Sequence, residues 1–273
     1  MSTQLIIFTD LDGTLLDSRY TFEKALPAIN LIKEENIPLV LCSSKTRAEI
    51  EHIRKKLGNN HPFISENGGG IFIPKGYFSV PIPIFRFRSA EEGDYVCIKL
   101  GASYDDLRKA LAQLRSEGFN VRGFGDMNLR ELMAITGLKT NDAKMARQRD
   151  FDEPFIFSGN ETSERRLKRR IRAGGFNYTQ GEFFHITGKS DKGRAVEILK
   201  RIYEKQYGKI KTAALGDSPN DIPMLNRVDH PVVVRKHDGT YDRRINMPGV
   251  VKADGIGPCG WNRAVMEMIS LFG

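Results

Sequence analysis

Residues 6–14, IIFTDLDGT, contain an apolar run that ends abruptly in two carboxylates. The run is short and β-prone, so it predicts a buried strand with Asp10 and Asp12 at its carboxyl end. Ligands of open α/β sheets bind at that edge of the sheet. A strand end followed by a plain Asp-Gly turn is the alternative, and it accounts for Asp12 and Gly13 but not for Asp10. The stretch therefore indicates a ligand site at the end of the first strand.

Two carboxylates this close together repel each other, so either one is protonated or both share a cation. A hard divalent ion such as Mg²⁺ suits oxygen ligands of this kind. Asp10 is then placed to act as a nucleophile, because carboxylates form aspartyl-phosphate intermediates. Asp12 is placed to protonate the leaving alcohol and later to activate water. The pair therefore predicts metal-assisted phosphoryl transfer.

The composition indicates a protein of two domains with an anionic ligand. The chain has 273 residues, 40% of them hydrophobic, and a net charge of +8. That charge suits phosphorylated small molecules as well as nucleic acid. Basic runs with interleaved aromatic residues, which favour nucleic-acid binding, are missing from the sequence, so we expect no nucleic-acid partner. A nucleic-acid-binding module without catalysis is kept as a rival hypothesis.

The cysteines and the apolar runs bear on where the protein works. Cys42, Cys97 and Cys259 form a sparse, odd set without metal-like spacing, which is typical of a reducing cytosol. The first four residues lack the features of a signal peptide. No apolar run approaches the length of about 20 residues that spans a bilayer. We therefore expect a cytoplasmic protein that does not bind membranes.

The order of the elements predicts an α/β fold with an insertion. Strands near 5–8, 38–42 and 63–65 alternate with helices over 22–35 and 49–57, which is typical of a doubly wound, Rossmann-like parallel sheet. Residues 85–187 mix strands and helices without that alternation, and the first pattern resumes with a helix after Lys192. We therefore expect residues 1–84 and 188–273 to form one core and residues 85–187 an inserted α+β domain.

Four polar clusters follow strands of this core or open its returning half, and together they supply what phosphoryl transfer requires: a nucleophile, donors for phosphate oxygens and carboxylates for a metal. The clusters are Asp10 with Asp12, Ser43 with Ser44, Lys189 with Lys192, and Asp217 with Asp221.

This set resembles the haloacid dehalogenase-like (HAD) phosphatase superfamily. The stretch DLDGT at 10–14 is similar to the first motif, Ser43 to the second, Lys192 to the third and GDSPND at 216–221 to the fourth. The insertion resembles the C2-type α/β cap of the Cof-like branch, although that branch usually has Thr-Gly-Arg where this chain has Ser43-Ser44-Lys45. The resemblance implies a HAD fold and a cytoplasmic, Mg²⁺-dependent phosphomonoester hydrolase.

Within that superfamily the chain resembles the mannosyl-3-phosphoglycerate phosphatases, which implies a phosphorylated sugar substrate and a place in the synthesis of the compatible solute mannosylglycerate. A glucosyl substrate stays open, as do a phosphomutase or phosphotransferase on the same scaffold and the choice between monomer and homodimer. The stretches that carry this resemblance are LCSSKT at 41–46, SENGG at 65–69, TGL at 136–138 with Ala143 and Ala146, RDFDEP at 149–154 and GPCGW at 257–261.

The resemblance implies a role for each residue of the site. Asp10 is the nucleophile and a metal ligand, and Asp12 is the general acid and base whose main-chain carbonyl binds the metal. Asp217 binds the metal, with Asp221 as a ligand or a support. The residues that contact phosphate or substrate, or support that contact, are Ser43, Ser44, Lys192, Asn67, Asn220 and, from the cap, Arg149.

Several of these residues have a structural alternative. Ser43 and Ser44 also fit an ordinary helix cap. Lys189 competes with Lys192 for the phosphate, and we favour Lys192 because it directly opens a helix. Asn67 also fits a tight turn, and we expect His185 to pack rather than to catalyse.

Overall fold

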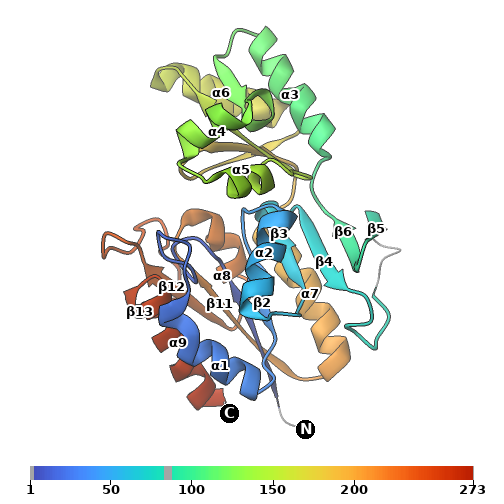
Figure 1. Cartoon of the computed structure of the whole chain (residues 1–273), viewed down its shortest axis with the longest axis vertical. Coiled ribbons are helices and arrows are strands. Elements are labelled where there is room, and N and C mark those ends of the chain that lie inside the picture. The colour runs from blue at the N-terminus through green and yellow to red at the C-terminus, as the bar shows by residue number, and fades with distance from the viewer. Residues whose placement is uncertain (1–2, 83–87, 273) are drawn as a thin grey trace.

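The computed structural model describes residues 3–82 and 88–272, which fold into two units, each built on its own β-sheet (Figure 1). The larger sheet has the strand order β13 (Val251–Ile256), β12 (His230–Arg235), β11 (Ile210–Gly216), β1 (Gln4–Thr9), β2 (Leu39–Cys42), β3 (Phe63–Ser65), β4 (Gly70–Pro74), β6 (Tyr95–Lys99) and β5 (Arg88–Glu92). The six strands from β13 to β3 are parallel, and β4, β6 and β5 continue the sheet in antiparallel pairing.

Helices cover both faces of the larger sheet, because its central strands are apolar on both sides. In β1, Leu5 and Ile7 belong to the core under α1 (Leu26–Glu34), α2 (Arg47–Leu57) and α9 (Pro258–Phe272). The alternate residues Ile6 and Phe8 belong to the core under α7 (Lys192–Tyr207) and α8 (Ile222–Leu225). The predicted doubly wound α/β fold is confirmed.

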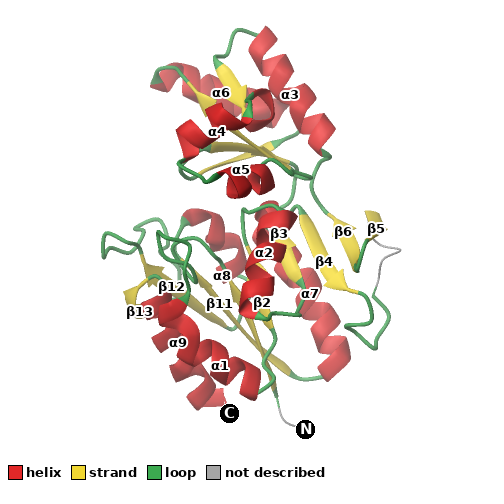
Figure 2. Cartoon of the chain, viewed as in Figure 1, coloured by secondary structure: helices red, strands yellow, loops and turns green. Residues whose placement is uncertain are grey.

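The smaller unit is an antiparallel sheet with helices on both faces (Figure 2). Helices α3 and α6 share a core with one face, and α4 and α5 pack on the other, with α5 on the side that faces the larger unit and in contact with α2. Its elements are β7 (Val121–Gly123), β8 (Asp152–Phe157), β10 (Phe184–Thr187) and β9 (Asn177–Gln180), in sheet order, with α3 (Tyr104–Ser116), α4 (Leu129–Thr136), α5 (Thr140–Ala146) and α6 (Glu161–Ala173).

The first boundary of the inserted domain needs a correction. The expected boundary between residues 84 and 85 lies outside the described residues. Residues 95–99, which we expected in the insertion, form a strand that pairs with β4 instead and buries Cys97 and Ile98 in the cores of the larger unit. A hairpin, β5–β6, thus extends the larger sheet, and the chain leaves that sheet after Lys99.

The chain crosses between the two units twice, after β6 and again after β10. The crossings touch, because a Cβ atom on Gly188 would lie 2.2 Å from the main-chain nitrogen of Ala102. The carboxyl ends of β1, β2, β3 and β11 face the smaller unit in Figure 1, so the polar residues that follow these strands lie between the units. Among the described residues we find no helix with the length and apolarity that a membrane crossing requires.

Candidate active site

The main chain holds Asp10 firmly at the end of β1. Its N–H donates to the carbonyl of Leu215 on β11 at 2.9 Å. The Thr9 hydroxyl donates to the Asp10 carbonyl at 2.7 Å and accepts from the indole N–H of Trp261 at 2.9 Å. Asp10, Thr9 and Trp261 are all buried. Their hydrogen bonds therefore hold the main chain that carries the Asp10 carboxylate in one position.

A buried lysine joins two of the predicted carboxylates. Nζ of Lys192, the first residue of α7, lies 2.6 Å from Oδ1 of Asp10 and 2.6 Å from Oδ1 of Asp221. Burial opposes the charge on this ammonium, but the two carboxylates outweigh that cost and raise the pKa of Lys192 above its usual range. Lys189, the rival in the sequence, has an exposed side chain. The structure therefore places Lys192, and not Lys189, among the acids.

Asp10, Asp217 and Asp221 form an acidic cluster in which one oxygen of each lies within 4.8 Å of the others. Burial and the neighbouring carboxylates raise the pKa of Asp10 well above its ordinary value. Burial and the charge of Asp221 raise the pKa of Asp217 to about 7. Burial and mutual repulsion disfavour the charged forms of these two carboxylates, so a cation bound in the cluster would stabilise them. Carboxylate oxygens are the ligands that a hard divalent cation prefers. The predicted metal-binding residues are thus brought together in part.

The carboxylates of the cluster differ in how many hydrogen bonds and ion pairs they make with the rest of the protein. Asp221 is fully engaged, because Oδ1 meets Lys192 and Oδ2 accepts from the N–H groups of Asp217 and Ser218 at 3.1 Å each. The Asp217 carboxylate accepts no hydrogen bond from the described chain and lies against Gly13, where a Cβ atom would stand 2.7 Å from Oδ2. Asp217 is therefore free to bind a cation, whereas Asp221 is placed to orient Lys192 and the loop.

Asp12 lies apart from the cluster and has a cationic partner that the sequence analysis missed. Its side chain is 43% exposed, and Nζ of Lys45 lies 3.1 Å from Oδ2. Burial opposes the charge of Lys45, but Asp12 and Glu49 raise its pKa above the usual range. The other oxygen of Asp12 is buried without a partner among the described residues. Lys45 directly follows the serines at the end of β2, but the sequence does not show which carboxylate its long side chain meets.

The two serines are not helix caps. The residue that caps α2 is Thr46, whose hydroxyl accepts from the N–H of Glu49 at 3.2 Å. The buried hydroxyl oxygen of Ser43 accepts from the N–H of Lys45 at 3.2 Å, which leaves its proton to donate. The hydroxyl of Thr14 is buried and has no partner in the described chain. These hydroxyls are suited to donate to the oxygens of an anion.

A chain of hydrogen bonds connects the acidic loop to the smaller unit. Asn220 donates to Oδ1 of Asn67 at 3.2 Å, and Asn67 donates to Asp152 at 3.1 Å. Nδ1 of His185 lies 2.9 Å from both oxygens of Asp152. The prediction that His185 packs accounts for its partly buried position on β10 but not for this contact. Asn67 and Asn220 therefore meet each other, and Asn67 reaches the smaller unit at the start of β8.

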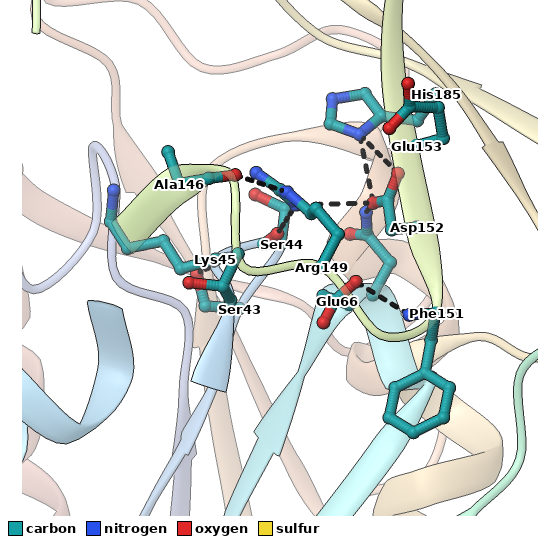
Figure 3. Close-up of polar contacts among 12 residues, drawn as sticks. Ser43, Ser44, Lys45, Glu66, Ala146, Arg149, Phe151, Asp152, Glu153 and His185 are labelled. Carbon is teal, nitrogen blue, oxygen red and sulfur yellow. Dashed lines mark hydrogen bonds and ion pairs between the residues drawn. The ribbon is translucent and has the colours of Figure 1, made fainter. Parts of the chain in front are cut away.

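Arg149 connects the smaller unit to the loop after β2 (Figure 3). Its side chain is 6% exposed, its Nε donates to the carbonyl of Ala146 at 2.9 Å, and one terminal nitrogen donates to the carbonyl of Ser44 at 3.0 Å. The same nitrogen lies 4.0 Å from the Asp152 carboxylate. The residue expected to contact substrate from the cap is thus docked beside the predicted phosphate loop.

Glu66 makes a second connection, which the sequence analysis did not identify. Its buried carboxylate accepts from the main-chain N–H groups of Asp150 and Phe151 at 2.8 to 3.1 Å. Burial raises the pKa of Glu66 to about 8 although Arg149 opposes that shift. Glu66 and Asn67 both have positive φ angles, 47° and 56°, a conformation that costs bulky residues energy. A strained turn therefore holds this loop against residues 150–152.

Comparisons with known proteins find a matching family model and several similar chains. A family model described as haloacid dehalogenase-like hydrolase matches residues 7–79 and 138–240. A glucosyl-3-phosphoglycerate/mannosyl-3-phosphoglycerate phosphatase of Methanococcoides burtonii is 46% identical over 267 residues, 97% of each chain. One with the same name from Persephonella marina is 42% identical over 97% of each chain. A mannosyl-3-phosphoglycerate phosphatase of Pyrococcus furiosus is 35% identical, covering 84% of this chain and 90% of its own.

Two solved structures share the fold at lower identity. A Thermoplasma acidophilum protein has a TM-score of 0.68 at 19% identity, covering 98% of this chain and 99% of its own. A haloacid dehalogenase-like hydrolase from B. subtilis has a TM-score of 0.66 at 20% identity, covering 97% of this chain and 99% of its own.

Proposed function

The chain belongs to the haloacid dehalogenase-like hydrolases, and from that premise we propose that it removes phosphate from glucosyl-3-phosphoglycerate or mannosyl-3-phosphoglycerate. It is a phosphomonoester hydrolase. The observation that carries the proposal is the position of Asp10, at a strand end with Lys192 at 2.6 Å and Asp217 in the same acidic cluster. The names of the relatives support both sugars, so the proposal includes both.

We propose the following use of the site in the reaction. An oxygen of Asp10 attacks phosphorus, the bond from phosphorus to the glycerate oxygen breaks, and Asp12 gives that oxygen its proton. Asp12 then takes a proton from water, which attacks the aspartyl phosphate, releases inorganic phosphate and regenerates Asp10. The hydroxyls of Ser43 and Ser44 and the ammonium of Lys192 are the proposed donors to the phosphoryl oxygens. Nζ of Lys45 lies 3.1 Å from Oδ2 of Asp12, so this contact orients the carboxyl group that is proposed to exchange protons with the leaving oxygen and with water.

We propose Mg²⁺ as the cofactor, held by Asp10, Asp217 and the main-chain carbonyl of Asp12. Asp221 supports these ligands, because both of its oxygens already have protein partners. When bound, the ion supplies positive charge for the transferred phosphoryl group. The ammonium of Lys192, 2.6 Å from Oδ1 of Asp10, opposes the rise in the pKa of Asp10 that burial causes, and so favours the carboxylate that attacks phosphorus.

The smaller unit is the proposed cap, beginning after β6 and ending near Thr187. It brings Arg149 and Asp152 to the loops that follow β2 and β3. Closure of such a unit excludes water and completes the site around the substrate. We also propose that the protein works in the cytoplasm, since its three cysteines are free and two of them are buried.

A phosphate-release screen tests this function. The substrates are mannosyl- and glucosyl-3-phosphoglycerate, 3-phosphoglycerate, several hexose phosphates and a phosphopeptide, each with and without Mg²⁺. We expect kcat/KM to be highest for the two glycosyl-3-phosphoglycerates and release to require Mg²⁺. A chain that prefers hexose phosphates or phosphopeptides has a different substrate from the one proposed.

A further inference from the structure

A cavity of about 720 Å³ lies between the two units, beside the acidic cluster but outside it. Its walls come from the loop around Tyr20, from one face of α2 and from the connection between α4 and α5. Its volume is within the range of small-molecule binding sites. None of the residues assigned above to phosphate, metal or catalysis contributes to these walls.

The cavity begins next to the proposed general acid. Lys45 and Glu49 line it, and Nζ of Lys45 lies 3.1 Å from the carboxylate of Asp12. Lys56, seven residues after Glu49 on α2, also lines it. At the helical rise per residue this separation is about 10 Å along α2. A group attached to the leaving oxygen beyond Asp12 therefore has room to extend into this space.

Tyr20 presents an aromatic ring to the cavity in an unusual backbone conformation. Its φ angle is 59°, and it is 52% exposed. Asp17 maintains the conformation, since its carbonyl accepts from the N–H of Tyr20 and its carboxylate accepts from the N–H groups of Arg19 and Thr21, all at 2.9 Å. Positive φ in a bulky residue is strained, and such conformations are concentrated at functional sites. Nζ of Lys45 lies over this ring, 4.7 Å from its centroid, and the exposed remainder of the ring offers a flat apolar surface to a ligand.

The polar groups of the cavity carry charges of both signs. Lys139 and Asp142 come from the smaller unit, and their side chains have no hydrogen bond or ion pair within the described ranges 3–82 and 88–272. Lys139 follows the stretch TGL at 136–138, which also lines the cavity. A wall with free donors, free acceptors and an aromatic face suits an uncharged ring that carries many hydroxyl groups better than it suits a second anion.

We propose that this cavity binds the hexosyl group of the substrate, with Tyr20 stacking on the sugar ring and Lys139 and Asp142 bonding its hydroxyls. This inference rests on the proposed function and adds the residues that make the enzyme prefer a glycosylated phosphoglycerate to an unglycosylated one. Tyr20 comes from the larger unit and the other two from the smaller, so the sugar is recognised by both units together.

The test compares how the enzyme binds substrates with and without the hexose. KM is measured for glucosyl- and mannosyl-3-phosphoglycerate, and 3-phosphoglycerate is measured as a competing inhibitor. We expect the ratio of its inhibition constant to KM to fall about tenfold in Tyr20→Ala and in Lys139→Ala, because the ring loses its partners. Tyr20→Phe keeps the aromatic face and should keep most of the ratio.

Matched controls lie outside the cavity. Tyr207→Ala removes another partly exposed tyrosine, on α7, and Lys144→Ala another exposed lysine, on α5. Lys139→Ala tests the cavity even where Tyr20→Ala fails to fold. A wild type that hydrolyses glycosyl-3-phosphoglycerates while both cavity variants keep its ratio overturns this inference alone. A wild type that does not hydrolyse them overturns the proposed function and the inference together.

Discussion

Nζ of Lys192 lies 2.6 Å from Oδ1 of Asp10, and both side chains are buried. The same ammonium is equally close to Asp221, so one positive charge compensates two carboxylates. Charges taken out of water are tolerated only when they are paired and hydrogen-bonded. The nucleophile therefore depends on Lys192 before any phosphate is present.

Replacing Lys192 with methionine should destabilise the fold and abolish activity. Removing one partner of a buried ion pair costs about 3–5 kcal/mol, because the other charge stays buried without compensation. Unfolding in urea measures the loss, and phosphate release measures activity. Lys189→Met, three residues earlier and exposed, is the control and should change neither by much. Equal effects of the two substitutions would contradict the role given to Lys192.

Asp10→Asn should reduce phosphate release by about a thousandfold or more, because an amide does not form the acyl phosphate. The near-ultraviolet circular dichroism should match that of the wild type. Asp94→Asn replaces an exposed aspartate on the larger unit and should retain activity. Full activity in Asp10→Asn would mean that another residue is the nucleophile.

A divalent cation should stabilise the folded protein through Asp217. Binding to the native state alone raises the melting temperature, so Mg²⁺ added after chelator treatment should raise it in the wild type. Asp217→Asn removes a charged ligand and should weaken this response about tenfold or more in Mg²⁺ concentration. Differential scanning calorimetry over a Mg²⁺ series gives both values. An undiminished response in the variant would place the ion elsewhere.

The stability of the protein should fall as pH rises, in part because of Glu66. Its pKa is raised by burial from 4.5 to about 8, so between these values the folded chain keeps a proton that the unfolded chain loses. The stabilisation is complete below pH 4.5 and is lost as pH rises through about 8, and it amounts to about 5 kcal/mol at most. Glu66→Gln cannot titrate, so its free energy of unfolding should decrease less from pH 5 to pH 9. Parallel curves for the two proteins would exclude this assignment.

Arg149→Lys should lower kcat/KM about tenfold. The guanidinium donates to the carbonyls of Ala146 and Ser44 at once, whereas an ammonium cannot reproduce the planar fork that spans both. Steady-state kinetics on a glycosyl-3-phosphoglycerate measures the loss. Arg147→Lys, at an exposed position two residues earlier, is the matched control. If both variants behave as the wild type does, Arg149 has no part in closing the site.

The grouping of Asp10, Lys192 and Asp217 could be predicted, because parallel strands end at one edge and each of these residues follows a strand or opens a helix there. The contact of Lys45 with Asp12 could not, since it depends on the direction of a long side chain. The bonds of Glu66 and Asn67 to residues 150–152 join segments about 85 residues apart and depend on how the two units dock. The alternation of strands and helices does not show which strands pair with each other. The residues of β6 were therefore expected in the inserted domain, although β6 pairs with β4 in the larger sheet.

We expect the contact between Gly188 and Ala102 to limit how the smaller unit can move. Two connections far apart would allow the smaller unit to shift in many directions. Because the two connections here touch each other at the backbone, we expect rotation about one line through that contact. Rotation about that line would carry Arg149 and Lys139 away from the larger unit together, so a single opening would uncover both the loop after β2 and the proposed sugar cavity. A side chain added at position 188 would wedge the pivot and slow the swing without touching a single reacting atom.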